Sequence, residues 1–264
     1  MDISNFIANK NEKPLDTLVS DGGFTGIFRK IGAIGDSLAS GEFEKVGEGG
    51  SKEYHDCFDF SWGQYIARIA GTTVYNFSRG GMTAREFCES FGDRYNYFDK
   101  ATACSAYIVA LGVNDANGDI EIGSIDDINF TKPKNHPCTF CGYYGEMVLR
   151  YKEISPDAKF FFVTVPNDTK FTERSMQRLL KIREFLFEFA EKLGSSYVLD
   201  LYKYGPQYNE EFKENFFLLG HMNPMGYMLT AKIFTSYIDY IIRNNPGDFK
   251  EVGFIRAHYE RTVL

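Results

Sequence analysis

The sequence predicts an α/β domain built around a parallel β-sheet. Short apolar runs alternate along the chain with longer amphipathic stretches, which is the pattern of βαβ units. The apolar runs are rich in β-branched and aromatic residues, as expected for strands that are covered on both faces. The length of 264 residues suits one such domain with a substantial core.

These patterns predict each element in turn. We expect strands, in chain order, at 29–34, 73–77, 106–111, 160–165 and 197–201. We expect helices at 61–70, 84–91, 142–154, 173–193 and 224–243. In the helix at 173–193 the apolar residues recur at helical spacing, so one face packs on the core, and Gly194 ends the helix as a C-cap.

The remaining segments are the two ends of the chain and one long loop. Residues 1–27 form a lead-in that we expect to cover one edge of the sheet. Residues 117–137 form a polar loop that is longer than most strand-to-helix connections, and we expect it to overhang the functional site. We expect a single domain that spans 1–264. The tail at 248–264 is expected to pack either on this domain or on a second subunit, and in the second case the protein would be a homo-oligomer.

The composition excludes several classes of function. A net charge of −7 and a pI near 5.2 argue against a nucleic-acid-binding face, which needs clustered basic residues. The sequence has no apolar run long enough to span a membrane and no signal peptide at its start, so we expect a cytoplasmic protein.

An odd count of five cysteines fits reduced thiols. The pair Cys138 and Cys141 lacks the further ligands of a zinc site, and its role stays open.

The most informative motif is a serine directly after the first predicted strand. Ser37 follows the apolar run 28–35, and the small residues at 39–41 leave room for another molecule to approach. Three further blocks follow in the chain. The four blocks are Gly35-Asp36-Ser37-Leu38, Ser78-Arg79-Gly80-Gly81-Met82-Thr83, Leu111-Gly112-Val113-Asn114-Asp115 and Gly220-His221-Met222-Asn223-Pro224.

These blocks are placed to meet at one edge of the sheet. In doubly wound sheets, ligands bind beyond the carboxyl ends of the strands, where the strand order reverses. With a flavodoxin-like order, Ser37, Gly81 and Asn114 follow three adjacent strands, and His221 precedes the last helix. A serine nucleophile needs an adjacent base, and His221 is the candidate because the other histidines lie in no comparable block. The N–H groups of Ser37 and Gly81, with the side-chain amide of Asn114, are candidate oxyanion donors.

In this order the blocks resemble the SGNH (GDSL) hydrolases, which are named for a Ser, a Gly, an Asn and a His. The resemblance covers about 31–240. It implies a three-layer α/β/α sandwich with five parallel strands, and it implies hydrolysis of a carboxylic ester through an acyl-serine intermediate without a metal or an organic cofactor. By this resemblance Ser37 is the nucleophile, Gly81 and Asn114 are oxyanion donors and His221 is the general base.

One position departs from the family pattern. The family usually has an Asp three residues before the His, to orient the imidazole, and here that residue is Leu218. We favour a main-chain carbonyl near 217–218 as the orienting group, with Glu211, Glu214 and Asp200 as alternative carboxylates. We interpret Asp36 as a cap of the helix that follows Ser37, and Asp115 as structural.

The leading hypothesis is an esterase for short acyl groups, with acetyl esters on a carbohydrate as the expected substrates. A lipase or thioesterase for longer acyl chains is the alternative within enzymes. Because of Leu218, a non-catalytic ligand-binding module on the same scaffold is a further alternative. A flavin or nucleotide binder of flavodoxin-like topology is disfavoured, since no Gly-x-Gly-x-x-Gly or phosphate loop follows the first strand.

Overall fold

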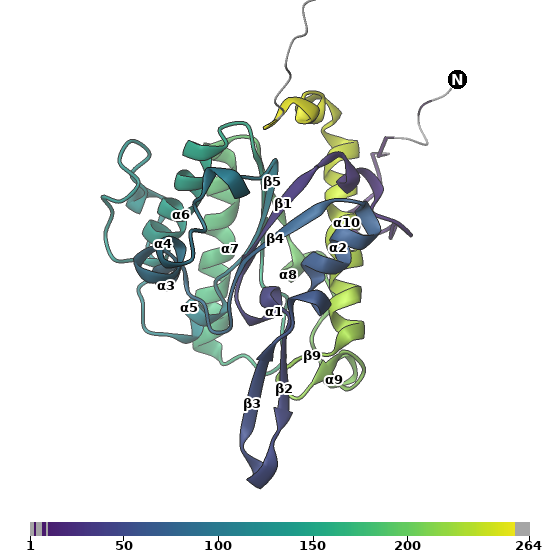
Figure 1. Cartoon of the computed structure of the whole chain (residues 1–264), viewed down its shortest axis with the longest axis vertical. Helices are drawn as coiled ribbons and strands as arrows, with labels where there is room; N and C mark the ends of the chain where they lie inside the picture. Colours follow the sequence, from purple (N-terminus) through teal and green to yellow (C-terminus); the bar gives the residue numbers. More distant parts are fainter. Residues whose placement is uncertain (1–2, 4–6, 9, 257–264) are drawn as a thin grey trace, which may run out of the picture.

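The centre of the molecule is a sheet of five parallel strands in the order β4-β1-β5-β6-β7. The computed structural model describes residues 3, 7–8 and 10–256. Numbered along the chain within this sheet, the order is 2-1-3-4-5, as a flavodoxin-like topology requires. Figure 1 shows helices on both sides of the sheet, so the predicted three-layer α/β/α architecture is confirmed.

All five predicted strands are present, with ends that differ from the prediction by at most two residues. They are β1 (Lys30–Gly35), β4 (Thr73–Ser78), β5 (Ala106–Ala110), β6 (Lys159–Val163) and β7 (Ser196–Leu199). Alternate side chains enter different cores, because successive residues of a strand point to opposite faces. In β6, Phe160 and Phe162 belong to one buried cluster, and Phe161 and Val163 belong to the other.

The helices form the two outer layers. One cluster packs the sheet against α6 (Phe140–Ile154) and α7 (Glu173–Leu193), and α3 (Ala84–Glu86), a π-helical turn at Phe87–Phe91 and α4 (Gly92–Arg94) lie beside α6. The other cluster packs the sheet against α2 (Trp62–Ala70) and α10 (Pro224–Asn244). In the described part of the chain, no helix combines the length and apolar content needed to cross a bilayer.

The long helices begin where a side chain can cap them. Ser61 Oγ accepts from the N–H of Gln64 at 3.2 Å, and Thr172 Oγ1 accepts from that of Ser175 at 3.1 Å. Asn223 Oδ1 accepts from the N–H of Gly226 at 2.9 Å. Each cap satisfies an N–H that has no partner within its own helix, which is why the predicted starts of these helices are accurate.

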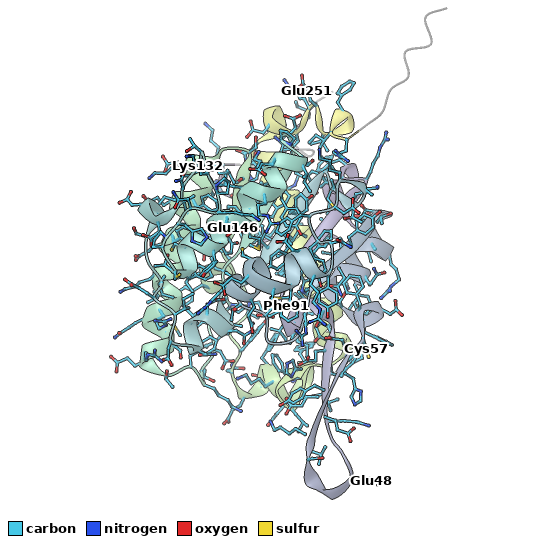
Figure 2. All side chains as sticks on the ribbon, turned by 60° about the vertical axis from the view of Figure 1, so that its left-hand side comes forward. Glu48, Cys57, Phe91, Lys132, Glu146 and Glu251 are labelled. Atoms are coloured by element: carbon cyan, nitrogen blue, oxygen red, sulfur yellow. The ribbon has the colours of Figure 1, made fainter. Side chains whose placement is uncertain are left out.

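A β-hairpin that the sequence patterns do not predict projects from the body of the domain. It follows α1 (Ser37–Ser40) and consists of β2 (Glu42–Val46) paired antiparallel with β3 (Lys52–Asp56). Figures 1 and 2 show the hairpin extending away from the sheet, with Glu48 at its tip. Besides 3₁₀ turns, the short elements include α5 (Val113–Asn117), α8 (Leu201–Tyr204), α9 (Glu210–Phe216), β8 (Phe217–Leu218) and β9 (His221–Met222).

The lead-in lies on helices rather than on an edge of the sheet, which corrects the prediction. The 3₁₀ turn Gly23–Ile27 packs on α10 and α2. The N–H of Val19 donates to Ser236 Oγ at 3.0 Å, and the N–H of Phe24 donates to Asp239 Oδ1 at 2.9 Å. Both side chains on α10 are buried and therefore need hydrogen-bond partners, which the main chain of the lead-in supplies. Residues 1–2, 4–6 and 9 lie outside the described residues.

The long loop at 117–137 packs into the core instead of overhanging the site. Its side chains Ile122, Ile125 and Ile128 are buried in the cluster that contains α6 and α7. Their burial anchors the loop on the helical layer, although its overall composition is polar. The prediction that this loop covers the site is therefore wrong.

The first part of the tail packs on the domain. Phe249 and Val252 are buried in the cluster that contains α2 and α10. The Arg256 guanidinium donates to the carbonyl oxygens of Lys100 and Ile154 at 2.6 and 3.2 Å. The remainder of the predicted tail, 257–264, lies outside the described residues.

Candidate active site

Three of the candidate residues follow neighbouring strands. β1 lies between β4 and β5, so the carboxyl ends of these three parallel strands meet at one edge of the sheet. Ser37 follows β1, Gly81 follows β4 and Asn114 follows β5. The structure thus brings the three blocks to the edge that the sequence predicts.

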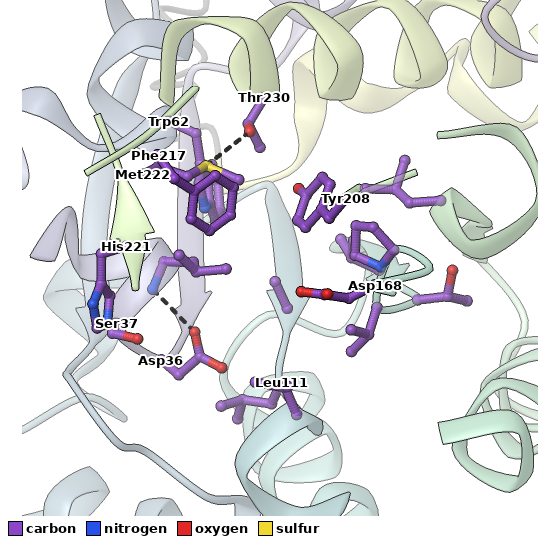
Figure 3. Close-up of a pocket in the computed structure, with 18 of the residues that line it drawn as sticks. Asp36, Ser37, Trp62, Leu111, Asp168, Tyr208, Phe217, His221, Met222 and Thr230 are labelled. Carbon is purple, nitrogen blue, oxygen red and sulfur yellow. Dashed lines mark hydrogen bonds between the residues drawn. The ribbon is translucent and has the colours of Figure 1, made fainter. Parts of the chain in front are cut away.

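Ser37 is held at a tight turn between β1 and α1. Asp36 is the N-cap, and its Oδ1 accepts from the N–H of Leu38 at 3.1 Å (Figure 3). At the other end, Gly41 adopts a φ of +77°, and its N–H donates to the Ser37 carbonyl. The predicted capping role of Asp36 is therefore confirmed, and the backbone of Ser37 is fixed on both sides.

The turn that carries Gly81 is tied to the end of β5. Gly81 has a φ of +71°, which favours glycine because a Cβ would strain the backbone there. Asn114 Nδ2 donates to the carbonyl of Met82 at 3.1 Å. Asp115 Oδ1 accepts from the N–H of Ala84 at 3.1 Å. Asp115 is buried, and this contact confirms its structural role.

His221 lies between two carboxylates of the projecting hairpin. It is the first residue of β9, and its side chain is 16% exposed. Its Nδ1 lies 3.2 Å from Glu44 Oε2, and its Nε2 lies 3.0 Å from Glu42 Oε1. Tyr54, on the partner strand of the hairpin, approaches the imidazole edge-on with ring centroids 5.8 Å apart. Both ring nitrogens are thus engaged from β2.

The orienting groups expected from the sequence are not the ones found. Leu218 is 47% exposed, and the hydrogen bond that the structure gives to the His221 ring among the described residues is with Glu44. Asp200 instead accepts from Arg183 Nε at 2.8 Å. Glu211 and Glu214 are exposed on α9. The prediction that a main-chain carbonyl orients the imidazole is therefore wrong, because the Glu44 carboxylate on β2 contacts the ring instead.

The pKa values of the two carboxyl groups of β2 are shifted in opposite directions. The hydrogen bond from Lys52, followed by those from His221 and the Gly220 N–H, holds the pKa of Glu44 below its usual value. Burial raises the pKa of Glu42. Glu44 is therefore the carboxyl that stays ionised, and Glu42 takes up a proton more readily.

A cavity of about 260 Å³ opens beside Ser37 and His221 (Figure 3). Its walls are mainly apolar and come from the ends of β5 and β6, from α2 and α10, and from the segments between β6 and β9. Among the described residues, the lining does not include Gly81, Asn114 or any part of 117–137. The apolar lining residues include Leu38, Trp62, Leu111, Val163, Val165, Phe171, Leu201, Phe217, Met222 and Phe234.

Two buried carboxyl groups beside the site make stability depend on pH. Burial raises the pKa of Asp36 and of Asp115 to about 7 in each case. Because these values exceed that of an unfolded Asp, the folded state binds more protons between about pH 4 and pH 7, and stability falls as the pH rises through that window. We expect the free energy of unfolding in urea to be lower at pH 8 than at pH 5, by up to about 2.6 kcal/mol for each carboxyl.

The variant Asp115→Asn isolates one of these contributions. The amide oxygen can still accept from Ala84 N–H, but the side chain has no charge to bury. The pH dependence of unfolding should therefore become shallower. Asp119→Asn is the control, because the Asp119 side chain is fully exposed. An unchanged slope in Asp115→Asn would contradict the expectation.

The cysteine pair stands apart from this site. Cys138 is exposed and Cys141 is buried, and both are free thiols. Burial raises the pKa of Cys141, which makes the thiol unreactive. His136, the histidine nearest to the pair in the sequence, contacts Glu146 at 2.9 Å instead. Within the described residues, no group of three or more His, Cys, Asp or Glu side chains is arranged to hold a metal ion.

This chain resembles known proteins in its fold but not in its sequence. No family model matches this sequence, and neither does the sequence of any curated protein. Solved structures do match, at low sequence identity. A family two carbohydrate esterase from Clostridium thermocellum, solved with cellohexaose, superposes with a TM-score of 0.58 at 17% identity, over 90% of this chain and 66% of that one.

Two further structures have the same architecture. A protein described as a GDSL-like lipase, from Bacteroides uniformis, superposes with a TM-score of 0.52 at 17% identity, over 79% of this chain and 94% of that one. A family 2 carbohydrate esterase with a carbohydrate-binding domain, from Myceliophthora fergusii, gives 0.54 at 16% identity, over 80% and 65%. Together with the strand order and the four blocks at the edge of the sheet, these matches show that the chain has the fold of the SGNH (GDSL) hydrolases.

Proposed function

We propose that this protein is a serine ester hydrolase that acts through an acyl-serine intermediate. The observation that carries the proposal is that Ser37 and His221 line the same cavity at the carboxyl edge of the sheet. These residues are 184 positions apart (221 − 37), and only the fold brings them to one site. A hydroxyl beside an imidazole at the mouth of a cavity is the arrangement that nucleophilic catalysis needs.

The reaction proceeds in two acyl transfers. Ser37 Oγ attacks the ester carbonyl carbon and its proton passes to His221 Nε2, while the carbonyl electron pair moves to the oxygen. When the tetrahedral intermediate collapses, the C–O bond to the alcohol breaks and the alcohol leaves with the proton from Nε2. A water molecule then attacks the acyl-serine, again giving a proton to His221, which returns it to Ser37 Oγ as the acid departs.

The oxyanion of each intermediate requires hydrogen-bond donors. The N–H groups of Ser37 and Gly81 and the amide of Asn114 are the candidates. Asn114 Nδ2 carries two hydrogens, and the contact with the Met82 carbonyl uses one of them. The second hydrogen has no acceptor among the described residues, and we assign it to the oxyanion. Donors of this kind contribute about 3–4 kcal/mol each.

The first candidate substrate is a short-chain ester, with acetyl groups on a carbohydrate as the expected class. Two of the structural neighbours are carbohydrate esterases of family 2. By analogy with these two enzymes, we propose a carbohydrate as the alcohol. The charged and aromatic side chains of the hairpin beside His221, among them Tyr54 and Lys52, suit a polar alcohol.

The second candidate is an ester with a longer acyl chain, and the cavity favours it. An acetyl methyl group would fill only a small part of the cavity of about 260 Å³. Water would occupy the rest and would contact apolar walls such as Trp62 and Phe234. A longer chain would bury its methylenes there, and each buried methylene contributes about 0.8 kcal/mol. If the acyl group occupies this cavity, kcat/KM should rise by about fourfold per methylene until the cavity is full.

A series of p-nitrophenyl esters from acetate to decanoate tests both the activity and the acyl length. A rise through octanoate supports the longer acyl group, and a maximum at acetate supports the acetyl class. Ala110→Leu, which adds volume at the cavity wall, should lower the ratio of octanoate to acetate activity if acyl chains bind there. If no ester is hydrolysed, the non-catalytic binding module is favoured instead. That alternative was suggested by the lack of a carboxylate near His221 in the sequence, and the structure supplies one in Glu44.

A further inference from the structure

The turn before His221 places the imidazole beside β2. Leu218 pairs with His221 across the two-residue strands β8 and β9, and Leu219 turns the chain with a φ of +59°. The N–H of Gly220 then points at the hairpin and donates to Glu44 Oε2 at 3.0 Å. The same oxygen lies 3.2 Å from His221 Nδ1. One carboxylate oxygen therefore holds both the ring and the backbone that carries it.

Glu44 is bound in a way that keeps it charged. Its side chain is 2% exposed, and its Oε1 lies 2.5 Å from Lys52 Nζ. A buried carboxylate is costly unless it is paired with donors. Lys52 Nζ and the Gly220 N–H donate to Glu44, and Nδ1 of His221 is its third partner. Since an ionised carboxylate can only accept, the contact with His221 requires the proton to be on Nδ1. Nε2 is then the nitrogen that exchanges protons.

The hairpin is fixed at its root, so this contact does not depend on a loose loop. The Tyr227 hydroxyl on α10 donates to the Glu42 carbonyl at 2.7 Å. Ser40 Oγ donates to Asp56 Oδ1 at 2.5 Å, and the Cys57 N–H donates to the Gly41 carbonyl at 3.0 Å. Because side chains alternate along a strand, Glu42 and Glu44 share the face that meets β9.

We propose that Glu44 is the positioning residue for His221, supplied by the hairpin in place of a carboxylate at position 218. This inference rests on the proposed ester hydrolysis. Glu44 holds the Nδ1–H tautomer and stabilises the imidazolium that forms when Nε2 takes the Ser37 proton. The proton that moves is the one on Ser37 Oγ, and the Nδ1 proton stays on the ring.

Other charged groups also face this imidazole. Glu42 lies at Nε2 on the same strand, and it must move off that nitrogen before Ser37 can transfer a proton to it. Asp36 lines the same cavity from the strand end. Lys52 and Asp56 lie on β3, and the Tyr54 phenol lies at the ring edge. Glu44 differs from these groups because, within the described ranges of the chain, it is the residue that contacts Nδ1.

The variant Glu44→Gln tests the proposal, because it keeps the volume and removes the charge. We expect kcat for ester hydrolysis to fall by about 10²- to 10⁴-fold. Glu44→Asp, which keeps the charge, should recover part of the rate. Glu53→Gln is the matched control, since Glu53 lies on β3, is 40% exposed and binds Lys45 and His55.

Proton NMR provides a readout that does not need turnover. The Nδ1–H of His221 should give a low-field resonance in the wild type, in Glu44→Asp and in Glu53→Gln, and this resonance should be lost or shifted upfield in Glu44→Gln. Wild-type activity with unchanged rate and resonance in Glu44→Gln would overturn the positioning role and leave the hydrolase proposal standing. An inactive wild type that shows the Glu44-dependent resonance would uphold the contact and reject the hydrolase. Equal losses in Glu44→Gln and Glu53→Gln would mean that the hairpin acts only as scaffold, which also overturns the proposal.

Discussion

Replacing Ser37 by alanine is expected to lower kcat for the hydrolysis of the best p-nitrophenyl ester by about 10⁴- to 10⁶-fold. The substitution removes the only atom proposed to form a bond with the acyl group. It should leave the fold intact, because Asp36 and Gly41 hold the turn through backbone groups and the Asp36 side chain. A phosphonate ester that mimics the tetrahedral intermediate should label the wild type on the peptide that contains Ser37.

His221→Ala should cause a comparable loss, and the double variant should lose little more, because nucleophile and base act as one unit. Ser90→Ala and His55→Ala are controls, since both side chains are exposed and lie outside the cavity. Activity that survives in Ser37→Ala would place the reaction at another residue. Labelling at a peptide without Ser37 would lead to the same conclusion.

Replacing Asn114 by alanine is expected to lower kcat by about 10²- to 10³-fold, with KM changed by less than about threefold. The amide is proposed to bind the oxyanion, which exists only in the transition state and the intermediates. Its loss should therefore appear in kcat rather than in substrate binding. The same substitution also removes the hydrogen bond to the Met82 carbonyl, which costs about 1 kcal/mol of stability.

The control for this variant is Asn117→Ala. Asn117 lies at the exposed end of the same short helix, α5, and its side chain is exposed. Urea unfolding of both variants separates a loss of stability from a loss of catalysis. A large rise in KM with an unchanged kcat in Asn114→Ala would show that the amide binds the ground state of the substrate, and the oxyanion role would have to be abandoned.

The sheet and its order were predictable because their signals are local. Strands covered on both faces appear as dense apolar runs, and the start of each long helix carries its own cap in the sequence, such as Ser61 or Asn223. The positions of Ser37, Gly81 and Asn114 follow from these strands, because a residue after a parallel strand lies at a known edge of the sheet. That part of the candidate site was therefore accessible from the sequence.

The partner of His221 was not accessible in this way. Glu44 lies 177 residues before it, on a hairpin whose strands are largely exposed and lack the apolar density of the central sheet. A signal exists in the alternation of Glu42, Phe43 and Glu44 ahead of the glycine-rich turn at 47–50, which is typical of a hairpin. The contact itself depends on how the hairpin leans on β9, and no local pattern specifies that angle.

The hairpin enters and leaves the domain at one point, where Cys57 meets Gly41. Such a segment can be exchanged as a cassette. Replacing it with a short turn would retain the sheet and Ser37, and it would take away the groups that flank both nitrogens of His221. By grafting one contiguous stretch of chain, a designer could thus add or remove both carboxylates that contact His221. The group that orients the imidazole would then belong to a segment that can be exchanged separately from the histidine, whereas an Asp three residues before the His belongs to the same segment as the His.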